Sequence, residues 1–366
     1  MIIPIKPWLD LISEDVSAGS AARLGTGYAG VALSSDPVAE EIDRSRLVGV
    51  SSNKWQFESN RMEFYHEPIL AARIVEAMQP LQGKQIFDGT LGGGGHAELL
   101  LGHGAHVIGC DQDEEALGYA SKRLGHFGDQ FLPVRGNFGD VDSILADHGL
   151  DRVDGMLLDL GVSSRQLDNA ERGFSFREDA QLDMRMDTRS DFSAKELLNE
   201  WSEEELARVI FEYGEERRSR RVAREIVKAR EKKAIETTFE LVEIVGRVIP
   251  KTSAKNPATR VFQAVRIAVN RELDVLEQAL EKSVGVLAPG GVLAIITFHS
   301  LEDRIVKQFM RRMSSPFVDR PEWPEPKENP DYHFNLPTRR AIAPDESEVS
   351  ANPRARSAKL RLAVKV

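Results

Sequence analysis

The chain has 366 residues, of which 41% are hydrophobic and 29% are charged. These proportions are ordinary for a soluble globular protein with one large or two ordinary domains. No run of about 18 apolar residues could cross a membrane, and the N-terminus lacks the basic and apolar segments of a secretory signal. The one cysteine, Cys110, cannot form an internal disulfide and suits a reducing compartment, so we expect a cytoplasmic protein.

The formal net charge is −10. This acidity argues against a non-specific nucleic-acid binder, because such proteins usually carry an excess of positive charge that neutralises phosphates. A local basic patch can still bind RNA. If RNA is the substrate, the acidic body favours a structured, specific target.

Residues 1–61 differ from the rest of the chain. They are rich in Ser, Ala, Gly and acidic residues and show no sustained period of 2 or 3.6. We expect a flexible N-terminal extension there. Two explanations stay open: Met62 is the true translation start, or the extension is a tail specific to the lineage. The first amphipathic helix is predicted just after it, at residues 69–78.

Strand and helix alternate from residue 85 onward. Short apolar strands are predicted at residues 85–88, 106–111, 131–134 and 153–159, with helices at 97–101 and 114–124 between them. This alternation indicates a parallel sheet covered on both faces by helices.

The alternation stops at about residue 168. Residues 168–270 show almost no strand signal, and helices are predicted at 194–198, 203–213, 216–230 and 238–248. We therefore expect an all-helical domain inserted into an α/β domain made of residues 62–167 and 271–366. In the second part of that domain the pattern predicts a helix at 272–287, a turn at Pro289-Gly290-Gly291, a strand at 292–298, a surface loop at 316–337 and a closing strand at 358–364 near the sheet's edge.

A glycine-rich segment lies between the first predicted strand and its helix, Asp88-Gly-Thr-Leu-Gly-Gly-Gly-Gly-His96. Glycines let the backbone approach a ligand, and a helix N-terminus offers unpaired N–H groups. Asp111 ends the second strand, where an acid can accept hydrogen bonds from ribose hydroxyls, and Asp159 ends the fourth. Each acid alone could be a helix cap, but together around one crevice they predict a cofactor site.

Two cofactors fit these residues. Gly92-x-Gly94-x-x-Ala97 followed by Asp111 is similar to a dinucleotide fingerprint, which leaves a nicotinamide-dependent oxidoreductase open. Asp88 and Asp159 favour S-adenosylmethionine, because an acid just before the loop can meet a cationic amino-acid group. No Gly-Lys-Ser/Thr follows the glycines, and no His or Cys has metal-ligand spacing, so neither a P-loop nor a metal site is expected.

Several further motifs occur in order along the chain. They are Asp159-Leu-Gly-Val-Ser-Ser-Arg-Gln-Leu-Asp168, Arg172-Gly-Phe-Ser-Phe176, Leu182-Asp-Met-Arg-Met-Asp187, Tyr213-Gly-Glu-Glu216, Ala258-Thr-Arg-Val-Phe-Gln-Ala-Val-Arg-Ile-Ala-Val-Asn270, Phe298-His-Ser-Leu-Glu-Asp-Arg-Ile-Val306 and Asn352-Pro-Arg-Ala-Arg-Ser-Ala-Lys359. Together with the glycine segment, this set closely resembles the bacterial ribosomal RNA small subunit methyltransferase H family, over residues 64–366.

The resemblance implies S-adenosylmethionine-dependent N4-methylation of a specific cytidine in the decoding region of 16S rRNA. It also implies a Rossmann-like class I methyltransferase sheet with a helical recognition domain inserted after the fourth strand. The partner it implies is 16S rRNA within the small ribosomal subunit, with no membrane; the oligomeric state stays open, and a homodimer is compatible with the sequence. The cofactor-binding residues that it implies are Gly94, Gly95, His96, Asp111, Phe138, Asp159 and Gln166.

The chemistry of cytosine agrees with methylation at nitrogen. Its exocyclic amine is a poor nucleophile, so an enzyme must align it with the methyl group and accept its hydrogens. Methylation at C5 normally needs a thiolate, and Cys110, beside the predicted ribose-binding acid, is badly placed for that role. We expect Asp159 or a neighbouring backbone carbonyl to accept the N4 hydrogen bond; a role for Asp159 in cofactor binding alone stays equally open.

The expected RNA contacts are basic and aromatic. A loop that combines both kinds of side chain suits phosphate contact and base stacking, which favours Arg172-Gly-Phe-Ser-Phe176 and Arg354-Ala-Arg356. Met184 and Met186 are expected in a core. A non-catalytic RNA-binding or assembly factor is the remaining alternative, although intact glycines and acids argue against it. The full set of candidates is Arg172, Phe174, Phe176, Arg185, Arg260, Arg266, Arg354, Arg356 and Lys359.

Overall fold

The computed structural model describes residues 68–250 and 256–366. The predicted flexible extension at residues 1–61 and the alternative start at Met62 lie outside these residues. Within the described ranges, every helix is too short or too polar to span a bilayer.

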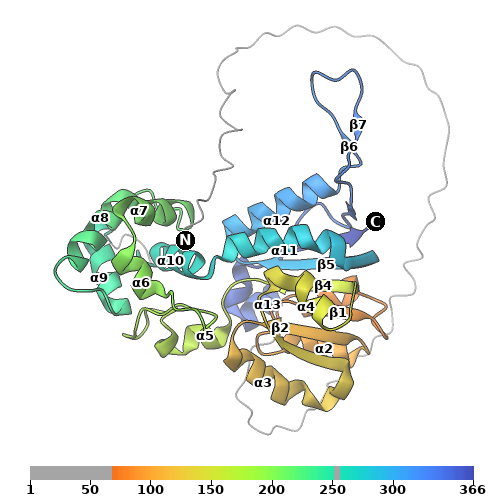
Figure 1. The fold of residues 1–366 in the computed structure, drawn as a ribbon, viewed down its shortest axis with the longest axis horizontal. Helices are drawn as coiled ribbons and strands as arrows, with labels where there is room; N and C mark the ends of the chain where they lie inside the picture. The colour runs from red at the N-terminus through yellow and green to blue at the C-terminus, as the bar shows by residue number, and fades with distance from the viewer. Residues whose placement is uncertain (1–67, 251–255) are drawn as a thin grey trace. The chain divides into compact units, whose positions relative to one another are not determined.

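A mostly parallel sheet lies at the centre of the α/β part of the chain (Figure 1). Among the described residues it has seven strands in the order β3-β2-β1-β4-β5-β9-β8. The parallel strands are β1 (Gln85–Asp88), β2 (His106–Asp111), β3 (Phe131–Arg135), β4 (Val153–Asp159) and β5 (Leu287–Thr297). The strand β9 (Lys359–Lys365) runs antiparallel to β5, and the short β8 (Phe334–Asn335) pairs with β9. The chain order reverses between β1 and β4, which is where open parallel sheets bind ligands, outside the carboxyl ends of the strands.

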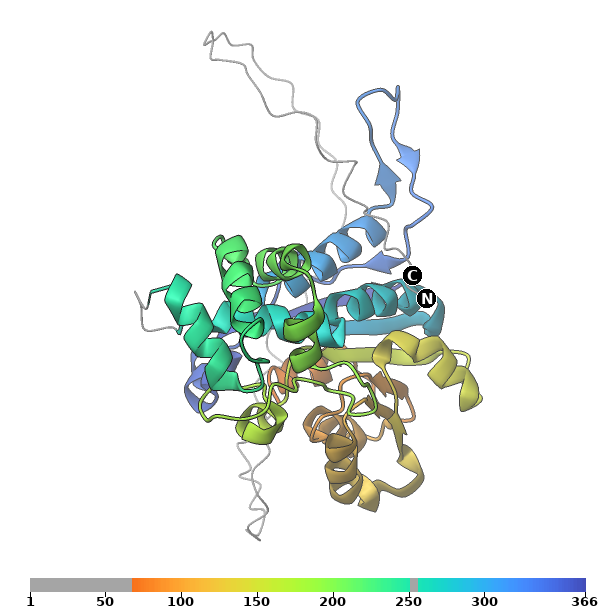
Figure 2. The ribbon, with the colours of Figure 1, turned by 60° about the vertical axis from the view of Figure 1, so that its left-hand side comes forward.

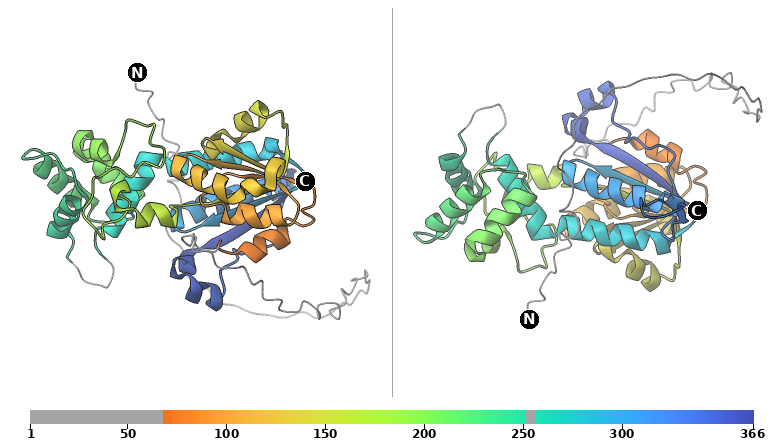
Figure 3. Two further views of the ribbon diagram at one scale, coloured as in Figure 1. Left: turned by 90° about the horizontal axis from the view of Figure 1, so that it is seen from below. Right: turned by 90° about the horizontal axis from the view of Figure 1, so that it is seen from above.

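Side chains along the strands alternate between two helical layers. In β4, Met156 and Leu158 are fully buried against one layer, and Leu157 is fully buried against the other. The first layer contains α4 (Val141–Asp147), α11 (Glu272–Val286) and α12 (Ser300–Met313). The second contains α1 (Ala71–Ala77), α2 (Gly95–Gly102) and α3 (Glu114–Leu124). The two panels of Figure 3 show the two layers, and the predicted sheet with both faces covered is confirmed.

A separate group of helices follows the short helix α5 (Ser164–Asp168). These helices share their own apolar core, in which Leu206, Val222 and Leu241 are fully buried. Capping boxes at Ser193, Ser202 and Thr237 fix three of their starts by pairing orphan backbone N–H groups with side-chain oxygens. The helices, drawn in green to cyan in Figure 2, are α6 (Ala194–Glu200), α7 (Glu203–Glu212), α8 (Ser219–Arg230), α9 (Thr238–Val248) and α10 (Thr259–Asn270).

The structure differs from the sequence-based expectation at the C-terminal strands. The strand β5 begins at Leu287, so Pro289-Gly290-Gly291 is an irregularity inside it rather than a turn before it. Leu287 pairs with Val153, and Val292 pairs with Gly155. Residues 288–291 therefore lie opposite Asp154 alone and form a bulge, in which Gly290 has φ 80. The expected surface loop at 316–337 contains the pair β6 (Phe317–Val318) and β7 (Lys327–Glu328), as well as β8. Because β8 pairs with it, β9 is not the outermost strand.

Candidate active site

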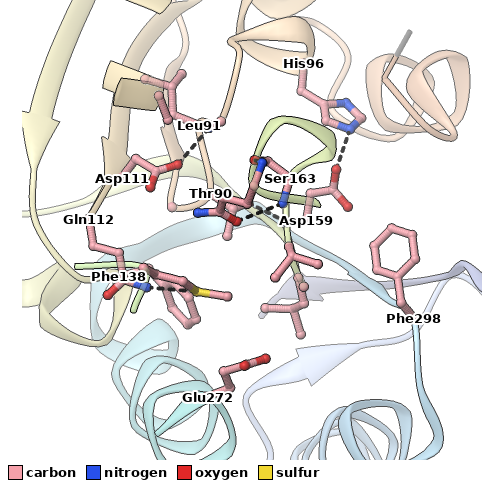
Figure 4. A pocket seen from close by; sticks show the side chains of 18 of the residues that line it. Thr90, Leu91, His96, Asp111, Gln112, Phe138, Asp159, Ser163, Glu272 and Phe298 are labelled. Atoms are coloured by element: carbon pink, nitrogen blue, oxygen red, sulfur yellow. Dashed lines mark hydrogen bonds and ion pairs between the residues drawn. The ribbon is translucent and has the colours of Figure 1, made fainter. Parts of the chain in front are cut away.

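A cavity of about 210 Å³ opens at the carboxyl ends of β1, β2 and β4. Figure 4 shows that its side chains come from the glycine loop, from the ends of the strands and from the start of α11. Its lining includes Thr90, Leu91, Gly92, Gly95, His96, Asp111, Phe138, Asp159, Gln166, Asn270, Glu272, Phe298, Glu302 and Arg354. The strands therefore bring together most of the predicted cofactor residues in one cavity.

The loop after β1 is shaped by its glycines. A Cβ atom on Gly89 would lie 2.6 Å from Leu158 Cδ2 and 2.7 Å from Phe138 Cβ, so a larger residue has no room there. Gly94 has φ 76, a conformation that side chains rarely adopt, and it precedes the first turn of α2. The loop backbone consequently packs directly against Phe138, which forms part of the cavity wall.

Asp111 holds this loop to the end of β2. Its Oδ2 accepts a hydrogen bond from the backbone N–H of Gly92 (2.8 Å), and its Oδ1 accepts one from Asp113 (2.9 Å). Burial raises the pKa of this carboxyl to about 6, against the lowering by these two hydrogen bonds. Asp111 also lines the cavity, as expected for a residue that meets ribose hydroxyls.

Asp88 has a different place from the one predicted. It is 1% exposed and lies beneath the loop, where its Oδ1 accepts a hydrogen bond from Thr90 N (3.2 Å). It does not line the cavity, so direct contact with a cationic ligand group is not supported. Burial raises its pKa to about 7, His96 opposes that rise, and Asp159 adds to it.

Asp159 and His96 face each other across the cavity (Figure 4). Asp159 Oδ2 lies 3.4 Å from His96 Nε2, and the backbone N–H of Asp159 donates to Thr90 Oγ1 (2.6 Å). Within the described ranges, the buried Asp159 Oδ1 has no hydrogen-bond partner. A buried polar atom without a partner is costly, so this oxygen is an acceptor available to a ligand.

Gln166 positions the loop after β4. Its Oε1 accepts from Ser163 N (3.0 Å) in a capping box, and its Nε2 donates to Asp113 Oδ2 (2.9 Å). The side chain is only 8% exposed, yet it lines the cavity. Sequence reasoning missed Asp113, whose only local signal is its position as the N-cap of α3.

The opposite wall is formed by residues that the sequence did not single out as site residues. Asn270, at the end of α10, accepts from Met186 N (2.8 Å) and donates to the carbonyl of Met184 (2.8 Å). Both methionines are buried, as expected. Asn270, Glu272 and Phe298 line the cavity, so the insertion contributes to the wall. All three belong to recognised motifs or lie just beyond one, but no local pattern shows that they face Asp159.

Three possible metal ligands lie near this wall. Glu272, His299 and Glu302 offer ligand atoms within 4.8 Å of one another. Arg266, however, binds both oxygens of Glu272 at 2.8 Å, and His299 Nε2 lies 3.0 Å from Glu302 Oε1. Both carboxylate oxygens of Glu272 are thus occupied by Arg266.

Several predicted RNA contacts are not available to RNA. Arg172 is 9% exposed and forms an ion pair with Asp113 at 2.8 Å, while Phe174, 7% exposed, belongs to the core of the insertion. Arg266 is engaged by Glu272, and Arg185 is bound by Asp183 through two nitrogens. The burial and pairing of Arg172, Phe174 and Arg266 correct the expectation that they contact RNA. A contact through Arg185, whose side chain is 25% exposed, stays a prediction.

The remaining candidates lie nearer to solvent. Phe176 is half-buried and packs edge-on against Phe262, with ring centroids 4.8 Å apart. Arg354 lines the cavity and pairs with Asp168 at 2.8 Å, and Lys359 pairs with Asp303 at 3.0 Å. Arg356 is exposed, and the Arg260 side chain is 60% exposed.

The model of the MraW methylase family matches residues 63–366. The chain belongs to this family. It is 47% identical over 308 residues to ribosomal RNA small subunit methyltransferase H of Carboxydothermus hydrogenoformans, covering 83% of this chain and 99% of that protein. It is 49% identical over 311 residues to the protein of the same name from Geobacter sulfurreducens, covering 83% and 100%. Among solved structures, it is similar to an rRNA methylase from Streptococcus thermophilus, with 12% identity, a TM-score of 0.37, and 79% and 92% of the two chains covered.

Membership of this methylase family makes S-adenosylmethionine the cofactor, and the predicted Rossmann-like class I fold is confirmed. The cavity fits such a ligand. Asp111 and Asp159 line it, and no lysine or arginine in the described ranges forms an ion pair with either of them. Acidic side chains without a cationic partner suit a cationic cofactor, and the loop backbone and Phe138 form part of the cavity wall.

Proposed function

We propose that this methyltransferase modifies N4 of a specific cytidine in the decoding region of 16S rRNA, within the small ribosomal subunit. The observation that carries the proposal is the buried, unpartnered Oδ1 of Asp159 in the cofactor cavity. The printed names of the relatives from Carboxydothermus hydrogenoformans and Geobacter sulfurreducens support small-subunit ribosomal RNA as the substrate.

When bound, the cofactor supplies an electrophilic methyl group. The chain must then hold the amine nitrogen in line and accept its hydrogen bond, because the lone pair of this nitrogen is delocalised into the ring. We assign that acceptance to Asp159 Oδ1. The Asp159 backbone N–H donates to Thr90 Oγ1, and His96 Nε2 lies 3.4 Å from the other carboxylate oxygen.

Methylation at carbon finds no suitable nucleophile here. Cys110 is buried within β2, and desolvation together with Asp111 raises the pKa of its thiol. A thiol held protonated cannot attack C6 of a cytosine, the step that normally opens the route to C5. Nitrogen methylation, which needs only an acceptor, suits the groups present.

The base must leave its stack to reach the cavity, which costs least in single-stranded or loop RNA. Phe298 and Asn270 line the cavity together with Asp159. Phe298 offers a ring for stacking, while both polar ends of Asn270 are occupied by Met184 and Met186. We therefore assign Phe298, rather than Asn270, the contact with the flipped base.

The test is methyl transfer from labelled S-adenosylmethionine to small ribosomal subunits that lack the modification. Large subunits serve as the control, because they also present ribosomal RNA phosphates but lack the target. Label in the small subunit alone supports the proposal. Cofactor binding without transfer to subunits or to free 16S rRNA would instead indicate an assembly factor.

A further inference from the structure

The segment that begins α8 is rich in arginine. Arg217, Arg218, Arg220, Arg221 and Arg224 fall within eight residues, in a chain whose formal net charge is −10. The inner face of the helix packs into the core of the insertion through residues that repeat at helical spacing, namely Ser219, Val222, Ala223 and Ile226. All five arginines are exposed.

Most of this charge is not neutralised. In the part of the chain that the structure describes, no hydrogen bond or ion pair engages the side chains of Arg217, Arg220 and Arg221. Arg218 donates to the carbonyl of Val248 (3.1 Å), and Arg224 Nε lies 3.4 Å from Glu203.

The two acids that directly precede the arginines make other contacts. Glu216 is buried; its Oε1 accepts a hydrogen bond from the backbone N–H of Arg218 (2.9 Å), and its Oε2 lies 3.7 Å from Arg260. Glu215 precedes the arginines by two residues, but its carboxylate accepts from Ser300 Oγ (2.8 Å) and lies 3.6 Å from Arg304. Both partners belong to α12. Neither carboxylate therefore forms an ion pair with the side chain of Arg217, Arg220 or Arg221.

Such an arrangement does not stabilise the helix. Positive side chains at a helix N-terminus oppose the helix dipole, and like charges one turn apart repel each other. The first turn of α8 has no acidic residue and no side-chain cap, whereas α3, α7, α9 and α12 all have acids there. These arginines consequently do not contribute to the stability of α8, and their exposed guanidinium groups are open to an external anion.

We infer that Arg217, Arg220, Arg221 and Arg224, here called the α8 arginine surface, bind the phosphate backbone of the RNA whose base enters the cavity. The inference rests on the proposed function and deepens it by naming where the RNA backbone lies. Guanidinium groups bind phosphate oxygens through two parallel N–H bonds, and several of them along one helix follow a backbone. Arg260, an RNA contact predicted from the sequence, donates to the carbonyl of Glu215 (3.2 Å) and thus borders this surface.

The test replaces three arginines that have no partner, in the variant Arg217→Gln, Arg220→Gln, Arg221→Gln. The matched control is Lys122→Gln, Lys307→Gln, Arg311→Gln, which removes the same charge from exposed positions on α3 and α12. Affinity for small subunits and methyl transfer are measured from low to high salt. The affinity for RNA falls as salt rises, and each phosphate contact adds about 0.7 to the steepness of log K against log salt. Because three contacts are removed, this plot should be shallower by about 2 for the variant than for the wild type. Its KM for subunits should rise roughly tenfold or more, with kcat and the Kd for S-adenosylhomocysteine unchanged.

Three further readouts separate this role from others. The melting temperature of the Gln variant should stay the same or rise, because repulsion is relieved; a clear fall would show that the arginines are structural. A variant with lysine at the same three positions keeps the charge and should recover most of the salt slope. The Gln variant could also bind naked 16S rRNA normally and small subunits weakly. That result would show that the α8 arginine surface contacts a ribosomal protein rather than RNA.

The inference and the proposed function fail in different ways. If the wild type methylates small subunits and the Gln variant keeps the same KM and salt slope, the α8 arginine surface does not bind RNA while the proposed function stands. If the wild type transfers no methyl group to any ribosomal RNA, the proposed function itself is wrong.

Discussion

The guanidinium of Arg172 lies 2.8 Å from the carboxylate of Asp113, and both residues are buried. The same carboxylate oxygen accepts from Gln166, and Arg172 also donates to the carbonyls of Arg185 (2.9 Å) and Met186 (3.4 Å). Asp113 follows Asp111, which holds the glycine loop. The ion pair between Arg172 and Asp113 therefore connects the start of the insertion to the segment between β2 and α3, which lies beside the cofactor site.

Replacing Arg172 with methionine should destabilise the protein strongly. It leaves Asp113 buried with an uncompensated charge, which typically costs about 3–5 kcal/mol. The matched control is Arg177→Met, because the Arg177 side chain is 76% exposed and lies 3.7 Å from Asp168; an exposed pair of this kind is worth less than about 1 kcal/mol. Urea denaturation measures both, and equal effects would show that the Arg172 pair is not structural.

Gly89→Ala should damage the cofactor site. The added Cβ would clash with Leu158 and Phe138, and overpacking of this kind costs about 1–3 kcal/mol. The Kd for S-adenosylhomocysteine should rise, because Phe138 lines the cavity. Gly118→Ala is the control: it lies within α3 with nothing near its Cβ position, so it should stabilise the protein by about 0.5–1 kcal/mol. An unchanged Kd in Gly89→Ala would contradict the place of Phe138 in the wall of the cofactor cavity.

The bounds of several strands and helices, and the acids at two strand ends, could be predicted from local patterns in the sequence. The strands β1, β2 and β4 and the helices α3 and α9 have the predicted bounds, because apolar runs and capping residues such as Thr237 mark their ends. The acids at the ends of β2 and β4 were likewise recognised by position. The partners of Arg172 and Arg266 were not, because Asp113 lies 59 residues from Arg172 and nothing local indicates the pairing.

Other features depended on packing rather than on pattern. The helix α12 was not predicted as an element. Glu302 within it is buried, and its carboxylate accepts hydrogen bonds from the backbone N–H groups of Phe298 (2.8 Å) and His299 (3.2 Å). The motifs favour the buried Arg172 for RNA contact and do not single out the exposed Arg217, Arg220 and Arg221. Exposure, the property that decides such a role, follows from the three-dimensional fold.

The stability of the ligand-free protein should depend on the protonation of Asp88. Burial raises the pKa of this carboxyl from 3.8 to about 7, so the folded state binds its proton more tightly than the unfolded state does. The resulting stabilisation is complete below pH 3.8 and is lost as the pH rises through 7. The free energy of unfolding should therefore fall by a few kcal/mol across this window, at about 1.4 kcal/mol per unit of pKa shift.

Asp88→Asn removes this titrating group and should flatten that dependence. Urea denaturation at a series of pH values measures the effect, with Asp151→Asn, an exposed position, as the control. The pKa of Asp111 is also raised, to about 6, so the free energy of unfolding of Asp88→Asn should still fall with pH, but less steeply. An unchanged slope in Asp88→Asn would contradict the buried, proton-binding state of this carboxyl.

Asp159→Asn should separate cofactor binding from turnover. The amide keeps the shape of the side chain and the backbone bond to Thr90, but its oxygen is a weaker acceptor for the N4 hydrogen bond. We expect a kcat lower by about 100-fold or more, with the Kd for S-adenosylhomocysteine within a few-fold of the wild type. Loss of cofactor binding in this variant would instead assign Asp159 to the cofactor alone.

The most direct test of the proposed function identifies the modified nucleotide itself. Small subunits lacking the modification are incubated with the enzyme and cofactor, and the RNA is digested and analysed by mass spectrometry of fragments and nucleosides. N4-methylcytidine at a single position of the decoding region, absent with Asp159→Asn, is the predicted result. 5-Methylcytidine, a ribose-methylated cytidine or label spread over many positions would contradict it.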